Sequence, residues 1–266
     1  MTVTVEVDAT LTLDVHVPGD LAVCLAATSP VVTESLVASS PSGTDVPLRE
    51  VRQPLSRTHV LRAPIGETQV TYRASIQRAS QDATALTDAE ALVYRRPSRY
   101  CPSDRLAGLA AAEFGGLDAR SCAFAVEQWI HDTVAYVPGV TDAVDDALHP
   151  LLARTGVCRD FAHLGVALCR AVGIPSRYTA VYAPGLDPMD VHAVFEAAID
   201  HHWYVFDATR LAPRPGLVRI GSGRDAADVA LVTSAGSALW SMAQHLTVTS
   251  TPVLPTDDRQ ALAVLP

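Results

Sequence analysis

The period of the hydrophobic pattern changes twice along this 266-residue chain, and these changes constrain the fold more than any other feature. Up to about residue 95, apolar and polar residues alternate in short runs, as in the segment 3–17, which is typical of half-buried strands. From about residue 103 to residue 171, apolar residues recur at helical spacing. Strand-like runs return at 176–182, 191–199 and 203–207. This order predicts an α+β fold rather than alternating β–α–β units.

The first part of the chain is predicted to be a β-sandwich. Further strand candidates lie at 20–27, 58–63 and 67–77, and loop sequences rich in proline, serine and glycine separate them. The pattern then breaks at Arg95-Arg96-Pro97. We therefore expect an N-terminal β-sandwich domain over residues 1–96, followed by a domain over residues 97–266 in which helices pack on an antiparallel sheet.

Composition excludes several classes of protein. Hydrophobic residues make up 48% of the chain and charged residues 18%, which indicates a folded protein with a sizeable core. A net charge of −9 argues against nucleic acid or an anionic membrane as the main partner. The alternating segment 2–17 does not resemble a signal peptide, and no apolar run reaches membrane-spanning length. We therefore expect a cytoplasmic protein.

The cysteines predict neither a disulfide framework nor a zinc site. There are five of them, an odd number, and no C-x-x-C pair occurs. Reduced thiols are the simpler interpretation, and the histidines show no recognisable ligand spacing. We expect no cofactor and no metal.

One cysteine stands where a nucleophile would stand. Cys158 follows Thr155-Gly156 and begins a helix that we expect to run to about Ala171 and to end at Gly173. The first turn of a helix has unpaired N–H groups and the positive end of the helix dipole. Both favour thiolate over thiol, and the thiolate is the attacking species. The Cys158 N–H is also well placed to contribute to an oxyanion hole.

A predicted hairpin supplies a base and a carboxylate for this cysteine. If the turn is centred near Asp200, paired residues have index sums near 400, so His192 faces a position near 208 and Asp207 is its neighbour. The three residues would then form a nucleophile, a base and an orienting carboxylate. By spacing alone, the alternative remains open that Cys158, His192 and Asp207 have only structural roles.

Other residues fit these roles less well. Cys169 lies roughly 16 Å further along the predicted helix than Cys158, which favours a buried core thiol. His163 follows Cys158 by five residues, a poor spacing for contact on one helix. Asp190 is a rival orienting group for the base, but the alternation of side chains along a strand favours Asp207. Asp160 is expected to cap or tether the start of the helix.

Several motifs in this order resemble the transglutaminase-like superfamily of cysteine proteases. The clearest is Gly156-Val157-Cys158-x-Asp160-Phe161, followed by Arg170-Ala171-Val172-Gly173-Ile174-Pro175-Ser176-Arg177. His192-Ala193 is similar to the family's histidine motif, and Trp203-x-x-x-Asp207 is similar to its aspartate motif. Residues 223–229 and 94–100 resemble segments of the bacterial branch, which also has an N-terminal β-rich domain. The chain departs from the family at Val194, where tryptophan is usual, and at Ala208, where proline is usual.

The resemblance implies a papain-like catalytic core in which Cys158 is the nucleophile, His192 the base and Asp207 the orienting group. It implies acyl transfer through a thioester, without a metal. We expect a peptidase, isopeptidase or amidase that acts on a protein or peptide substrate. The alternatives are an amine transferase with the same triad, a thiol acetyltransferase, and a silent binding or scaffold module. The oligomeric state is not predicted.

Overall fold

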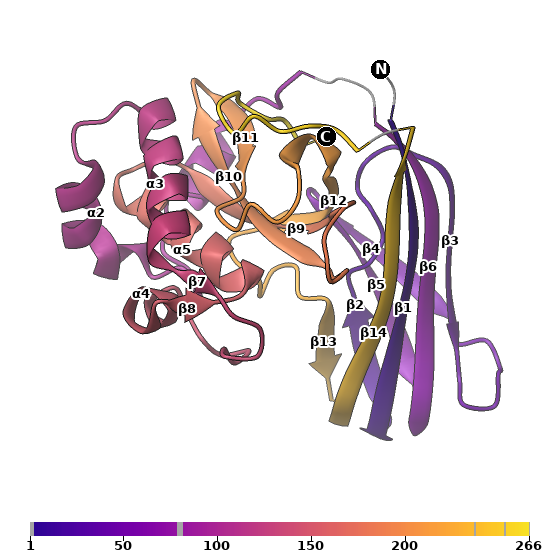
Figure 1. Ribbon diagram of the computed structural model, residues 1–266. Coiled ribbons are helices and arrows are strands. Elements are labelled where there is room, and N and C mark those ends of the chain that lie inside the picture. Colours follow the sequence, from indigo (N-terminus) through magenta and orange to yellow (C-terminus); the bar gives the residue numbers. More distant parts are fainter. Residues whose placement is uncertain (1–2, 79–81, 237, 253, 266) are drawn as a thin grey trace.

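A computed structural model describes residues 3–78, 82–236, 238–252 and 254–265. Within these residues the fold has three layers, with the helices on one side of a central group of strands and a tall sheet on the other (Figure 1). The predicted α+β class and the β-rich N-terminal region are confirmed. No helix in the described part of the chain is both long and apolar enough to cross a membrane.

The strands of the N-terminal region are those that the alternating pattern predicts, together with two that it does not. The pattern of residues 3–17 forms one continuous strand, and the candidates at 58–63 and 67–77 form strands close to their predicted bounds. The candidate at 20–27 forms a shorter strand that ends at Val23. The two unpredicted strands, 31–39 and 48–53, are largely exposed, so their sequences carry only a weak apolar pattern. The bounds are β1 (Val3–Val17), β2 (Gly19–Val23), β3 (Val31–Ser39), β4 (Leu48–Gln53), β5 (Ser56–Ala63) and β6 (Gly66–Arg78).

The middle of the chain is helical, as predicted. The helix with Cys158 at its start ends at Ala171, and nearly all its residues from 160 to 170 are buried, so it is the central helix of the core. A short helix before it ends at Ala153, and the next residue, Arg154, has a left-handed φ of 59°. The bounds are α1 (Asp88–Val93), α2 (Ala107–Phe114) after a 3-10 turn at Ser103–Leu106, α3 (Ala119–Thr133), β7 (Ala135–Tyr136), α4 (Leu148–Ala153), β8 (Thr155–Gly156) and α5 (Cys158–Ala171).

The last part of the chain contributes strands to both halves of the molecule. Their bounds are β9 (Ser176–Tyr182), β10 (His192–Ile199), β11 (His202–Phe206), β12 (Val218–Gly223), β13 (Val232–Ala235) and β14 (Ala238–Thr251). Strands β13 and β14 pair with β2 and β1, far away in sequence. In the described residues the strand orders are therefore β14-β1-β6-β3 and β11-β10-β9-β12-β5-β2-β13, with β4 beside β5. The domain boundary at residue 96 stays a prediction.

Helix α5 packs closely on β10, and one glycine makes this approach possible. A Cβ atom added to Gly165 would lie 2.5 Å from the ring of Phe195, which is closer than packed atoms come. The helix can therefore lie directly against the strand that carries His192 at its start. This packing brings the beginning of α5 and the beginning of β10 into the same region of the fold.

Candidate active site

Cys158 is the first residue of α5, and its side chain is half-buried at the edge of a cleft. The start of the helix is fixed by Asp160, which is fully buried and accepts a hydrogen bond from the Val157 N–H at 2.8 Å. Gly156 leaves room for this carboxylate, because a Cβ there would lie 2.9 Å from the Cβ of Asp160. The expectation that Asp160 tethers the helix start is confirmed.

A tyrosine that the sequence analysis missed lies beside the nucleophile. Tyr136, in β7, is within hydrogen-bonding reach of the Cys158 backbone N–H. Burial, followed by the nearby Cys158 and Asp190, raises the pKa of Tyr136 to about 12, so its hydroxyl stays protonated at neutral pH. The parallel pairing of β7 with β8 places Tyr136 opposite Gly156. Only this pairing, which joins two segments twenty residues apart, brings the phenol to the site.

His192 is the buried base candidate, and its two ring nitrogens have different surroundings. Nε2 lies 3.1 Å from Oδ2 of Asp207 and 3.4 Å from the Thr209 hydroxyl. Nδ1 is buried without a hydrogen-bond partner in the described structure, and the Cys158 thiol is close enough to the imidazole to raise its pKa. Nδ1 is thus the nitrogen left for the thiol. Burial alone would lower the pKa of His192, but Asp207, helped by Cys158, outweighs it and raises that pKa well above its usual value.

Asp207 comes directly after β11 and is fully enclosed. Its Oδ1 accepts hydrogen bonds from the Thr209 N–H at 3.0 Å and the Thr209 hydroxyl at 2.6 Å, which leaves Oδ2 for His192. Burial would raise the pKa of Asp207, but the charge and hydrogen bond of His192 outweigh it and lower that pKa, so the group is a carboxylate. The structure therefore brings together the three residues that the sequence analysis selected.

Helix α3 holds the segment that carries Asp207. Oε1 of Glu127 accepts a hydrogen bond from the Asp207 N–H at 2.8 Å, and Nδ1 of His131 lies 3.0 Å from the Ala208 carbonyl oxygen. Glu127 is 1% exposed, and burial raises its pKa to about 7. The sequence analysis did not identify this clamp. The signal for it was a carboxylate on the otherwise apolar face of α3, beside Val126 and Ile130.

The rival candidates lie outside the triad. Cys169 is completely buried in the core, which confirms the prediction, and burial raises its pKa. His163 is also completely buried, and its Nε2 accepts a hydrogen bond from the Ala226 N–H at 3.1 Å. Burial lowers the pKa of His163 to about 3, so its ring is neutral. Asp190 accepts a hydrogen bond from the Val191 N–H at 2.6 Å and another from Gln244, so it does not orient His192.

Cys158 and His192 line a cleft of about 730 Å³. Residues from α5, β9 and β10 form one wall, and residues of the segment 226–244, which includes β13, form the other. In the described residues no group of three or more histidine, cysteine, aspartate or glutamate side chains is arranged to hold a metal ion. The cleft thus offers a thiol and an imidazole as its reactive groups, and the buried Asp207 carboxylate lies behind the imidazole.

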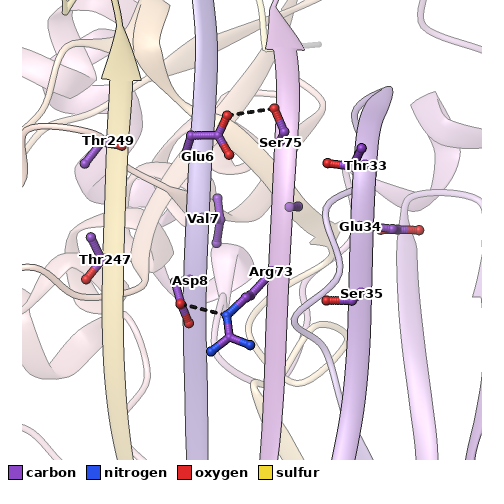
Figure 2. Close-up of a pocket in the computed structure, with 11 residues that line it drawn as sticks. Glu6, Val7, Asp8, Thr33, Glu34, Ser35, Arg73, Ser75, Thr247 and Thr249 are labelled. Atoms are coloured by element: carbon purple, nitrogen blue, oxygen red, sulfur yellow. Dashed lines mark hydrogen bonds and ion pairs between the residues drawn. The ribbon is translucent and has the colours of Figure 1, made fainter.

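A second hollow, of about 480 Å³, lies on the outer face of the sheet that contains β1 and β6 (Figure 2). Its charged side chains are paired with neighbours on the sheet: Arg73 donates to Asp8 at 2.9 Å, and Ser75 donates to Glu6 at 2.7 Å. The residues that line it include no cysteine and no histidine. It therefore lacks the chemistry of the cleft around Cys158.

Comparisons with known proteins identify the family and agree with the fold. A model of the transglutaminase-like superfamily matches residues 110–208. The chain is 29% identical over 144 residues to ML0607, an uncharacterized protein of Mycobacterium leprae (strain TN); the alignment covers 51% of this chain and 52% of that protein, so the chain spans about half the length of this curated relative. A crystal structure from Cytophaga hutchinsonii, described as a candidate cysteine protease, is 33% identical with a TM-score of 0.86, covering 98% of this chain and 96% of that one.

Proposed function

The chain belongs to the transglutaminase-like superfamily, and from this premise we propose that it is a cysteine hydrolase that cleaves an amide bond of a peptide or protein through a thioester at Cys158. The observation that carries the proposal is the pairing of Nε2 of His192 with Asp207, which leaves Nδ1 to the thiol. The description of the Cytophaga hutchinsonii protein as a candidate cysteine protease supports it.

The proposed reaction begins with proton transfer from the Cys158 thiol to Nδ1 of His192. The raised pKa of His192 favours the imidazolium that results, because the buried Asp207 carboxylate stabilises its charge. The thiolate then attacks the amide carbon. The negative charge that forms on the amide oxygen needs hydrogen-bond donors, and we assign this role to the Cys158 N–H and the Tyr136 hydroxyl.

In the second half of the reaction the tetrahedral intermediate collapses, the C–N bond breaks, and His192 gives its proton to the leaving amine. An acyl group remains on the sulfur as a thioester. Water, deprotonated by His192, then attacks the thioester carbon. The C–S bond breaks, a carboxylic acid is released, and the Cys158 sulfur and the proton on His192 restore the starting pair. An amine in place of this water would make the same triad a transferase, so the acceptor decides between the two activities.

The first experiment asks whether Cys158 is an activated thiol. The wild-type protein is treated with iodoacetamide at pH 6, and the labelling rate of each cysteine is measured by peptide mapping. Cys24 is the internal control, because it lines the same cleft but is 3% exposed, and burial raises its pKa to about 11. We expect Cys158 to react far ahead of Cys24. Equal labelling of the two residues would refute the proposal.

The second experiment asks which acceptor is used. Wild type and Cys158→Ala are incubated with peptide and isopeptide thioesters, alone and with hydroxylamine, and the products are identified by mass spectrometry. Formation of free acid by wild type alone supports hydrolysis. Preferential hydroxamate formation, again absent from Cys158→Ala, would replace hydrolysis with amine transfer. If neither protein is acylated by any donor, the scaffold alternative is favoured.

A further inference from the structure

The far wall of the active-site cleft is the inner face of strand β14. Leu239, Met242 and Gln244 pair with Val15, Leu13 and Leu11 of β1, all three of which are buried. Directly paired residues of neighbouring strands lie on the same face of a sheet. The three residues of β14 therefore point toward the interior of the sandwich, and all three line the cleft that contains Cys158.

This inner face is covered at one end of β14 and open at the other. Further along the same face, Leu246 and Val248 are buried, whereas Met242 is 45% exposed. Met242 lines the cleft, so part of its exposed surface faces the space in front of Cys158 and His192. A large apolar side chain that points inward and is still half exposed has surface that a ligand can bury.

Many of the other residues that line the cleft are small or apolar. Those from β9, from β10 and from the segment between β12 and β13 include Ala180, Ala193, Ala226, Val229 and Leu231, and two tyrosines, Tyr100 and Tyr178, also line the cleft. The small alanine side chains leave space within the cleft, and the valine and leucine side chains give the cleft an apolar surface. A concave site of this kind binds an apolar group and orients it with a few polar contacts.

The charged residues of the lining are already engaged by protein groups. Arg159 donates to the Asp142 carbonyl oxygen and lies 3.6 Å from the Asp160 carboxylate. Asp190 accepts hydrogen bonds from the Val191 N–H and from Gln244. The second of these bonds also ties β14 to the segment that leads into His192.

From this geometry we infer that Leu239, Met242 and Leu231, called here the Met242 wall, form a subsite for a large apolar side chain of the acyl donor. The inference rests on the proposed function. The acyl part is the part concerned, because it stays bonded to Cys158 in the thioester and its side chains remain within the same cleft. Full burial of a leucine or phenylalanine side chain corresponds to about a 10- to 100-fold preference over glycine.

The test uses acetyl-Xaa-Gly and acetyl-Gly-Xaa chloromethyl ketones, with Xaa as glycine, leucine, phenylalanine or aspartate. The rate of alkylation of Cys158 is measured by mass spectrometry. We expect the leucine and phenylalanine probes of one series to react about 10- to 100-fold faster than the glycine probe. In Met242→Glu and Leu239→Glu this ratio falls to near one. In wild type the aspartate probe alkylates Cys158 no faster than the glycine probe.

The matched control is Val37→Glu. Val37 lies on β3 of the same sheet, is 55% exposed and does not line the cleft, so its variant carries the same new charge without touching the wall. It keeps the wild-type ratio. Equal rates for all probes in wild type, or an unchanged ratio in Met242→Glu, would overturn the subsite. Failure of the proposed function is seen separately, as equal iodoacetamide labelling of Cys158 and Cys24 in wild type.

Discussion

Strand β10 carries two buried ionisable groups, and they differ in whether their hydrogen-bonding capacity is used up. Glu196 is 1% exposed and accepts hydrogen bonds from Arg177 at 2.8 and 3.1 Å, from Arg219 at 2.5 and 2.9 Å, and from the Thr179 hydroxyl at 2.8 Å. His192, four residues earlier, is equally buried, but its Nδ1 has no nitrogen or oxygen partner.

The two groups also differ in what their charges do. Burial would raise the pKa of Glu196, yet Arg177 and Arg219 outweigh it and hold that pKa far below its usual range. The carboxylate is therefore permanently charged and fully compensated, which suits a structural role. His192 has one compensating partner, Asp207, and one open nitrogen at a cleft. In the proposed mechanism His192 can accept the thiol proton because its Nδ1, unlike the oxygens of Glu196, has no hydrogen-bond partner in the described structure.

The largest expected effect comes from removing the charge of Glu196, which Arg177 and Arg219 compensate. In Glu196→Gln, Arg219 remains buried without a counter-charge, and Arg177 keeps only the partly exposed Glu90, at 3.2 Å. We expect a loss of about 3–5 kcal/mol in the free energy of unfolding, measured by chemical denaturation. Glu113→Gln, at an exposed position of α2, is the control and changes little. A loss below 1 kcal/mol for Glu196→Gln would show that the cluster is not essential to the fold.

The next largest expected effect comes from removing His192, the buried group whose Nδ1 has no partner in the described structure. In His192→Ala the Cys158 thiol has no base, and an unassisted thiol is almost entirely protonated at pH 6. We expect iodoacetamide labelling of Cys158 at this pH to fall about 100-fold. His163→Ala removes a histidine of the same core that has no contact with the thiol in the described structure, so its labelling rate is the comparison. Equal rates in the two variants would contradict the assignment of His192.

The smallest effect concerns Glu127, which holds the Asp207 N–H. Its pKa, raised from 4.5 to about 7, means that the folded state favours the neutral carboxyl. The stability that this group contributes is present below pH 4.5 and is lost as the pH rises through 7. The charges around it belong to Arg214, Asp207 and Arg259.

Glu127→Gln stays neutral and can still accept the Asp207 N–H. We therefore expect the variant to gain about 1–2 kcal/mol relative to wild type between pH 4.5 and pH 8. The measurement is denaturation of both proteins at pH 4.5, 6 and 8. A stability difference that does not change with pH would show that Glu127 does not titrate in this range.

Much of the site was predictable from the sequence, because Cys158 lies on one helix and His192 and Asp207 lie on one hairpin, and both elements are specified by neighbouring residues. Helical spacing and the stop at Gly173 gave the bounds of α5, and the hairpin around Asp200 gave a register close to the observed pairing of Phe195 with Phe206. The role of Gly156, just before α5, was not predicted. The left-handed φ in this segment belongs to Arg154, and Gly156 is needed for the close approach of Asp160.

The sequence by itself determined the α+β order, the position of Cys158 at a helix start, and the placing of His192 and Asp207 at one end of a hairpin. The tertiary structure decided which groups surround them: Tyr136 through the pairing of β7 with β8, Glu127 through the packing of α3, and Met242 through the pairing of β14 with β1. The physical reason is sequence separation. Periodicity records which face of a strand or helix is buried, whereas the partner that buries it is chosen by packing between segments that, for β1 and β14, lie more than two hundred residues apart.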